Sequence, residues 1–179
     1  MIVVKDSELV PRLLVTTGIG RERRVCEDIT NALFFRNEPV EVRPLERRGL
    51  VIVYSCRSCD PWALVHALRG AGIAGAFWAI PIQRSVPARY EYVARGCLDL
   101  VLLELEKHPV RIVAVCRKRG NYIDSCSRLC RYVGEYLERL GIIEVDFRRY
   151  EYILRIEIVD SDAHLSIYRR DQIHLLRLS

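Results

Sequence analysis

Short apolar runs and helically spaced apolar positions alternate through the first eighty or so residues. Val25, Ile29 and Leu33 recur at the spacing of one helical face, and Leu64, Ala67 and Leu68 repeat this later in the chain. Strands are predicted around these helices over 12–17, 40–43, 50–54 and 75–82. The resulting order, βαββαβ, is typical of a ferredoxin-like fold.

Local sequence signals mark the start and the end of the second of these helices. Asp60 followed by Pro61 is a helix start, with a capping carboxylate and a proline at the first helical position. The run 70–75, GAGIAG, has the spacing of a dinucleotide-binding loop, but it ends a helix and leads into a strand. A dinucleotide site needs the opposite order, so the glycines are interpreted as a helix stop and a turn.

The pattern changes after 85–87, SVP, which is interpreted as a linker. A helix over 94–105 follows, apolar on much of its circumference. A strand over 110–116 leads to a helix capped by Asp124 or Ser125, with Leu129, Val133, Leu137 and Leu140 on its core face and Gly141 as its stop. Closing strands are predicted over 145–147, 152–159 and 163–168. The sequence predicts an α+β protein with two subdomains, 1–84 and 85–179.

The composition argues against a membrane-spanning or secreted protein. Half of the 179 residues are hydrophobic, which is enough to bury a core. No apolar run approaches the roughly 18 residues of a membrane span, and the N-terminus, MIVVKD, lacks the pattern of a secretory signal. We expect a cytoplasmic protein with no membrane partner.

Arginine dominates the positive charge. The formal net charge is +5, and only three of the 28 basic residues are lysines: Lys5, Lys107 and Lys118. Arginine binds phosphate through a planar fork and stacks on bases, which suits RNA. Genomic GC bias or thermophilic surface ion pairs would give the same excess. Composition therefore leaves both interpretations open.

The basic residues concentrate between 111 and 131. This segment contains one acid, Asp124, against Arg111, Arg117, Lys118, Arg119, Arg128 and Arg131. Its centre, RKRGNY over 117–122, falls where a strand ends and a helix begins. Free amides and a positive dipole end at such a junction suit phosphate, and Asn121 and Tyr122 add a hydrogen-bonding group and a stacking face. The alternative is a solvated basic turn.

The same segment resembles a known family. The runs VCRKRGNY over 115–122, Ser127, and YVGEYL over 132–137 resemble the THUMP domain of tRNA-modifying proteins. Asp146-Phe147, followed by the strand containing Ile156-Glu157-Ile158, resembles its next motif. The match departs at Tyr150 and Glu151, where the family has proline and aspartate, so we expect a differently shaped turn there.

The resemblance implies a fold, a ligand and a role. A ferredoxin-like subdomain would precede a THUMP-type α/β domain, and the ligand would be tRNA, often held at its acceptor end. The chain stops just past the last THUMP-like strand, so it is similar to stand-alone members that act as adapters for tRNA cytidine acetylation. The RNA-binding residues expected on this basis are Arg117, Lys118, Arg119, Asn121, Tyr122, Arg128, Arg148, Arg149 and Arg169.

We expect no catalytic residues, metal or cofactor, with a separate modifying enzyme as partner. The histidines are scattered and are interpreted as surface or capping residues. Two other functions stay open: a subunit whose basic face binds an acidic protein, and a thiol-disulfide oxidoreductase using Cys56 and Cys59. That C-x-x-C pair, before a capped helix, could also be inert, disulfide-bonded, or a zinc site completed by Cys126 and Cys130.

Overall fold

A computed structural model describes residues 8–179, which leaves the N-terminal hexapeptide examined above outside the described residues. The chain divides into two compact units. One contains the residues up to Ile82 together with His174–Ser179, and the other runs from Gln83 to Ile173. The sequence-based division placed the boundary after residue 84 and assigned the last six residues to the second unit.

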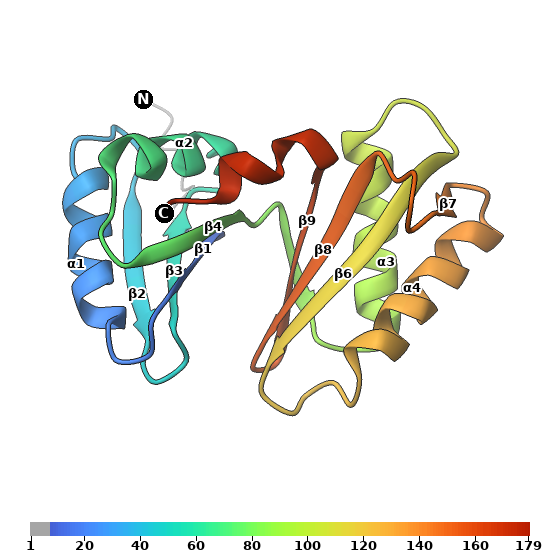
Figure 1. Cartoon of the computed structure of the whole chain (residues 1–179), viewed down its shortest axis with the longest axis horizontal. Coiled ribbons are helices and arrows are strands. Elements are labelled where there is room, and N and C mark those ends of the chain that lie inside the picture. The colour runs from blue at the N-terminus through green and yellow to red at the C-terminus, as the bar shows by residue number, and fades with distance from the viewer. Residues whose placement is uncertain (1–7) are drawn as a thin grey trace, which may run out of the picture. The chain divides into compact units, whose positions relative to one another are not determined.

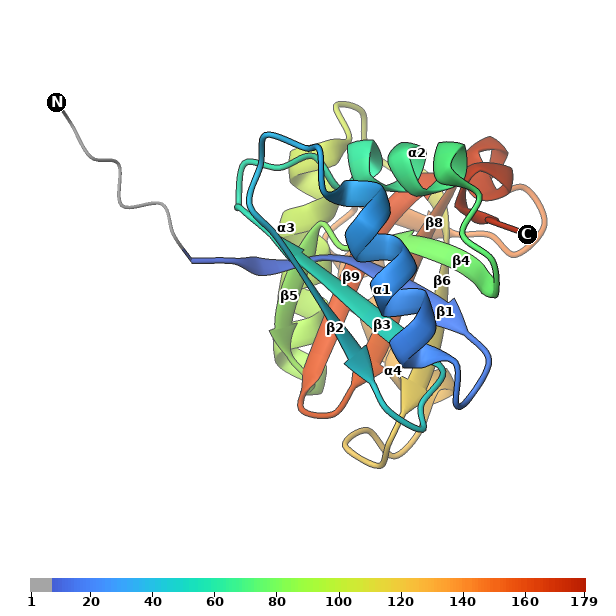
Figure 2. The same cartoon turned by 90° about the vertical axis from the view of Figure 1, so that its left-hand side faces the viewer.

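The first unit has the predicted βαββαβ order (Figures 1 and 2). Its elements are β1 (Val10–Thr17), α1 (Glu22–Leu33), β2 (Val40–Leu45), β3 (Leu50–Ser55), α2 (Pro61–Ala71) and β4 (Ala76–Pro81). The sheet order is β2-β3-β1-β4, with every neighbouring pair antiparallel. Helix α1 packs on β2 and β3, and α2 packs on β1 and β4.

The signals at α2 act as predicted. The Asp60 carboxylate accepts a hydrogen bond from the Trp62 amide at 3.0 Å, and Pro61 is the first helical residue. Gly72 ends the helix in the left-handed conformation, which glycine adopts without steric cost. Gly70 lies inside the helix rather than at its end.

The second unit is a five-stranded sheet in the order β5-β9-β8-β6-β7, with α3 (Tyr90–Glu104) and α4 (Cys126–Arg139) on one face (Figure 1). Its strands are β5 (Arg84–Pro87), β6 (Val110–Arg119), β7 (Ile143–Val145), β8 (Tyr152–Val159) and β9 (Asp162–Arg169), and a 3-10 helix follows over Arg170–Leu176. Strand β6 is parallel to both β7 and β8, whereas the β8–β9 and β5–β9 pairs are antiparallel.

Both units mix helices with sheet, so the predicted α+β class is confirmed. Among the described residues, no helix combines the length and apolar character that crossing a membrane requires.

Several details differ from the sequence-based prediction. The strand predicted over 145–147 lies at Ile143–Val145 instead, so Phe147 is in the turn that follows it. Residues 85–87 form strand β5 rather than a linker, and Pro87 is tolerated because β5 is an edge strand. Helix α3 is less enclosed than predicted, since Leu102 and Leu103 are exposed. Leu140, assigned to the core face of α4, is an exposed C-cap residue.

Candidate nucleic-acid interface

The basic run 117–119 belongs to strand β6 and not to the turn that the sequence predicted. Arg117, Lys118 and Arg119 pair with Glu157, Ile158 and Val159 of β8, which extend the strand past Cys116. Side chains alternate along a strand. Cys116 packs toward the core under the helices, so Lys118 points the same way, while Arg117 and Arg119 project from the opposite, helix-free face.

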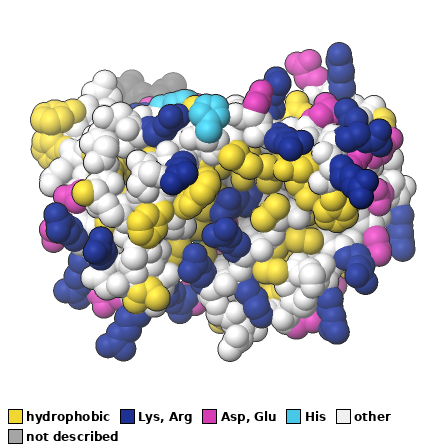
Figure 3. All heavy atoms as spheres, in the orientation of Figure 1, with side chains coloured by type: hydrophobic (Ala, Val, Ile, Leu, Met, Phe, Trp, Pro, Cys, Tyr) yellow, Lys and Arg dark blue, Asp and Glu magenta, His cyan; other side chains and the backbone are white. Residues whose placement is uncertain are grey.

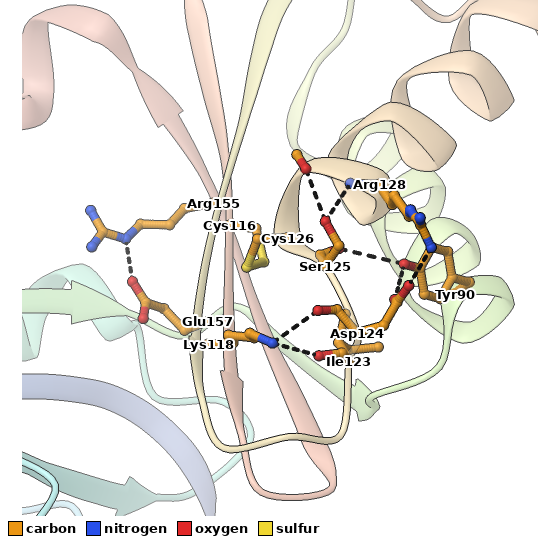
Figure 4. The surroundings of a disulfide bond; sticks show 11 residues. Tyr90, Cys116, Lys118, Ile123, Asp124, Ser125, Cys126, Arg128, Arg155 and Glu157 are labelled. Atoms are coloured by element: carbon orange, nitrogen blue, oxygen red, sulfur yellow. Dashed lines mark hydrogen bonds and ion pairs between the residues drawn. A yellow bond between two sulfur atoms is a disulfide. The ribbon is translucent and has the colours of Figure 1, made fainter.

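Lys118 holds the following loop in place. Its Nζ donates to the carbonyl oxygens of Ile123 and Asp124, each at 3.0 Å (Figure 4). The ammonium group therefore satisfies backbone acceptors at the start of α4 and is less available for phosphate. Its place in the predicted site is mainly structural.

The helix side of the loop is fixed by Asp124. Its Oδ1 accepts a hydrogen bond from the Tyr90 hydroxyl at 2.5 Å, and its Oδ2 pairs with the Arg128 guanidinium at 3.0 Å. The Tyr90 hydrogen bond is the main cause holding the pKa of Asp124 below its usual value. Desolvation, with a further contribution from Asp124, raises the pKa of Tyr90 to about 12. Part of the charge of Arg128 is thus used within the protein.

Ser125 is the N-cap of α4, one of the two residues that the sequence proposed. Its hydroxyl accepts a hydrogen bond from the Arg128 amide at 3.3 Å. Ile123, next to the cap, is buried in the core of the unit. The loop is therefore anchored at several points, and it presents a defined surface.

The groups left free on this surface are basic and aromatic. Arg117 and Asn121 are exposed, and 64% of Tyr122 is accessible to solvent. No ion pair joins Arg117 or Arg119 to a carboxylate within residues 8–179. We call residues 117–122 the basic arm. The guanidinium groups of Arg117 and Arg119 could contact phosphate, and the exposed ring of Tyr122 in the following loop could stack on a base.

The structure does not bring the other predicted arginines to this arm. Arg148 and Arg149 lie between β7 and β8, and Arg169 pairs in register with Tyr152, the first residue of β8. Because β8 runs parallel to β6, its first residue lies beside Ile112, seven residues before Arg119. That is about 23 Å of extended strand. The single predicted surface is therefore two groups at opposite ends of β6.

Two of the three distant arginines, Arg149 and Arg169, also form ion pairs. Asp146 Oδ1 accepts the amides of both Arg148 and Arg149 at 2.9 Å, and its Oδ2 pairs with the Arg149 guanidinium at 3.1 Å. Arg169 pairs with Asp171 at 3.1 Å. The amide of Arg149 is the main cause lowering the pKa of Asp146. Asp146 therefore shapes the turn after β7 and balances its charge.

Basic side chains are not confined to these two groups. Lys and Arg are spread over both units on the face drawn in Figure 3. Many are paired, for example Arg23 with Glu46, Arg84 with Asp99 and Arg111 with Glu151. Part of the arginine excess is therefore used in surface ion pairs. The places where arginines lack a carboxylate partner say more about a ligand site than the total number of arginines does.

A disulfide that the sequence did not predict closes the base of the arm. Cys116 of β6 is bonded to Cys126, the first residue of α4, with their Cα atoms 5.3 Å apart (Figure 4). This bond makes Cys126 unavailable as a zinc ligand beside Cys130. No group of three or more His, Cys, Asp or Glu side chains among residues 8–179 could hold a metal ion. The signal in the sequence that could have indicated this disulfide was the spacing of ten residues between two cysteines on either side of a strand–loop–helix turn.

A groove opens beside this disulfide. Its volume is about 590 Å³, and Ala114, Cys116, Val133, Val145 and the 75% exposed ring of Phe147 line its apolar part. Cys126, Cys130 and Arg131 of α4 also line it. It forms because β7 pairs only with residues 110–112, so the rest of that β6 edge is uncovered.

The C-x-x-C pair is reduced in the structure. Cys56 is partly accessible, while Cys59 is buried. A hydrogen bond from the Ser58 hydroxyl is the main cause lowering the pKa of Cys56, and burial is the main cause raising that of Cys59. The partly accessible thiol of Cys56, with its lowered pKa, therefore lies just before the capped helix α2.

His164 is not at the surface, where the histidines were expected to lie. Its ring is buried, with Nδ1 2.9 Å from the Ser85 hydroxyl.

Comparisons with known proteins were made by sequence and by structure. The sequence matches no protein-family model and none of the curated proteins with which it was compared. Solved structures do match. PH1313 from Pyrococcus horikoshii superposes with a TM-score of 0.72 at 22% identity, over 89% of this chain and 55% of that protein.

Two further solved structures also match this chain. TrmN from Thermus thermophilus superposes with a TM-score of 0.61 at 23% identity, over 89% of this chain and 46% of that protein. A 4-thiouridine synthetase, solved with RNA and ATP, has a TM-score of 0.58 at 14% identity, over 89% and 42%. This chain therefore spans about half the length of the proteins that it matches. It has the α+β fold found in part of PH1313, of TrmN and of an RNA-bound 4-thiouridine synthetase.

Proposed function

We propose that the protein is a tRNA-binding module of the THUMP type, with a ferredoxin-like first unit and a THUMP-type second unit. One observation carries the proposal: the basic arm leaves Arg117 and Arg119 of β6 without a carboxylate partner, and it leaves Tyr122 exposed on the anchored loop that follows. Such a surface binds a phosphate backbone and stacks on an unpaired base. The fold shared with a 4-thiouridine synthetase solved with RNA supports the choice of ligand.

The role that fits this module is that of an adapter without chemistry of its own. It would hold tRNA by the acceptor end and present it to a separate modifying enzyme in the cytoplasm, for which a cytidine acetyltransferase is our candidate. The support is the THUMP resemblance of residues 115–158.

Binding of labelled tRNA tests the proposal directly. Affinity should fall about tenfold or more between 50 and 200 mM salt if several phosphates are neutralised. Arg117→Ala and Arg119→Ala should each weaken binding, and each should lower the salt slope by about one if the residue contacts a phosphate. If Arg119 contacts a base edge, its loss should cost about 1–3 kcal/mol.

Arg149→Ala is the matched control. It removes an exposed arginine from the far end of β6, where Asp146 already balances the charge. Its affinity should stay within about twofold of wild type, since an exposed ion pair contributes little. Equal binding to duplex DNA, or unchanged binding by folded Arg117→Ala and Arg119→Ala variants, would contradict the proposal.

A second candidate function, thiol-disulfide exchange, is favoured by the acidified thiol of Cys56 beside Cys59. Insulin reduction by the purified protein tests it. Activity that Cys56→Ser abolishes would establish it, and an inactive wild type would exclude it.

A further inference from the structure

Three cysteines of the second unit meet at one groove. Cys116 reaches from β6 toward α4, Cys126 begins α4, and Cys130 lies one helical turn further on. All three line the groove of about 590 Å³ beside the exposed edge of β6. A small thiol can therefore reach the disulfide from solvent without unfolding the unit.

The disulfide encloses the residues that would bind RNA. The segment between Cys116 and Cys126 contains the whole basic arm. The other anchors of this loop are non-covalent: the Lys118 ammonium group on two carbonyls, Tyr90 on Asp124, and the buried Ile123 side chain. These contacts persist when the disulfide opens, so the loop would lose its covalent base but stay folded.

We propose that the Cys116–Cys126 disulfide is a reversible clamp on the basic arm, opened by a dithiol reductant that enters the groove. The inference rests on the proposed tRNA-binding function. A closed clamp holds Asn121 and Tyr122 of the loop in one arrangement relative to Arg117 and Arg119 on β6 before RNA arrives, so less conformational freedom is lost on binding. An open clamp leaves Arg117 and Arg119 in place on β6, where they pair with β8, but loosens the loop that carries Asn121 and Tyr122, so affinity falls.

The exchange balances without any further reactant. A thiolate of the reductant attacks one sulfur of the bond, forming a mixed disulfide and releasing the other cysteine as a thiolate. The second thiol of the reductant then attacks the mixed disulfide and releases the first cysteine. The dithiol is oxidised to a disulfide, the two cysteines are reduced, and the two protons of the dithiol pass to the cysteines. Cys126 is the favoured leaving group, because the N-terminus of a helix stabilises a thiolate.

Cys130 does not substitute for the external reductant. Burial is the main cause raising the pKa of its thiol, so it stays protonated near neutral pH and is a poor nucleophile. The clamp therefore responds to the surroundings rather than rearranging by itself.

The test measures tRNA affinity of the full chain in two redox states, oxidised as purified and reduced with dithiothreitol under anaerobic conditions. Alkylation and mass analysis count the thiols in each state. Reduction should raise the Kd about three- to tenfold, the effect of losing local preorganisation, while the far-UV spectrum stays unchanged. The double variant Cys116→Ser/Cys126→Ser should bind like reduced wild type whether or not the reductant is present.

Cys130→Ser is the matched control, since it removes a thiol from the same groove and leaves the clamp intact. It should keep the full redox response. The clamp is refuted if oxidised wild type binds tRNA and reduction changes the Kd less than twofold, if dithiothreitol leaves the disulfide intact, or if the double variant still responds. Failure of oxidised wild type to bind tRNA at all would refute the proposed function instead.

Discussion

At the scale of single residues, Tyr90 sets the behaviour of Asp124. The hydroxyl donates to the carboxylate and stabilises its charged form, so Tyr90→Phe should raise the pKa of Asp124 toward its ordinary value. A carboxyl-detected NMR titration of both proteins measures the shift.

The same pair gives a pH dependence with a definite sign. The pKa of Asp124 is lower in the folded than in the unfolded chain, so its contribution to stability is full above the unfolded pKa and is lost as the pH falls through the folded one. Tyr90→Phe should therefore flatten the fall of stability in acid, below about pH 4. Denaturant midpoints at pH 7 and pH 3 compare the two proteins. An equal acid loss in both would contradict the assigned role.

At the scale of elements, α3 packs tightly against the second sheet at Gly96. A Cβ atom there would lie 2.9 Å from Leu165 Cδ1 and from Val86 Cγ1, which belong to β9 and β5. Gly96→Ala should lower stability by about 1–3 kcal/mol, because helix and sheet must move apart. Thermal denaturation of the variant measures the change.

Gly70 provides the opposite case in α2. Its Cβ would meet no atom within 4 Å, and its backbone is helical. Gly70→Ala should stabilise the protein by about 0.5–1 kcal/mol, because alanine loses less conformational freedom on folding. If Gly70→Ala also lost stability, the gain expected from helix propensity would be wrong, while the loss in Gly96→Ala would still support the close approach.

The elements also show what the sequence could predict. Periodicity found both helices of the first unit and the strands that accompany them, and Asp60, Pro61 and Gly72 marked the ends of α2, because these signals act within a few residues. The extension of β6 through Arg119 was missed, because it depends on pairing with β8, about forty residues later. A linker was predicted at 85–87 for the same reason, since β5 is held by β9.

The candidate site was predicted only in part. The strand and the helix on either side of the loop were predicted, and Ser125 is one of the two caps that the sequence proposed, because these features are local. The disulfide and the Tyr90–Asp124 hydrogen bond were missed, since both join separate elements. Arg148, Arg149 and Arg169 were grouped with the arm because the sequence does not specify that β8 pairs with β6 in the parallel direction.

At the scale of the whole molecule, the last residues of the chain complete the first unit. Arg177 forms a bridge with Trp78 of β4, the amide of Leu178 donates to the Phe77 carbonyl at 2.9 Å, and Leu176 is buried. Leu176→Ala should therefore destabilise the first unit by about 2–5 kcal/mol. Hydrogen exchange should quicken at 76–81 and stay unchanged at 152–159. Faster exchange in β8 alone would contradict the assignment of this segment.

That contact has a consequence for how the protein is made. The ribosome releases β1 through β4 early, but the segment that covers the outer edge of β4 emerges only after the entire second unit has been translated. At about 5–20 residues per second, this delay lasts on the order of 5–20 s. During that interval the nascent chain exposes an uncovered strand edge, the kind of surface to which other unfolded chains add. The protein is therefore exposed to edge-to-edge association with other chains while it is being synthesised.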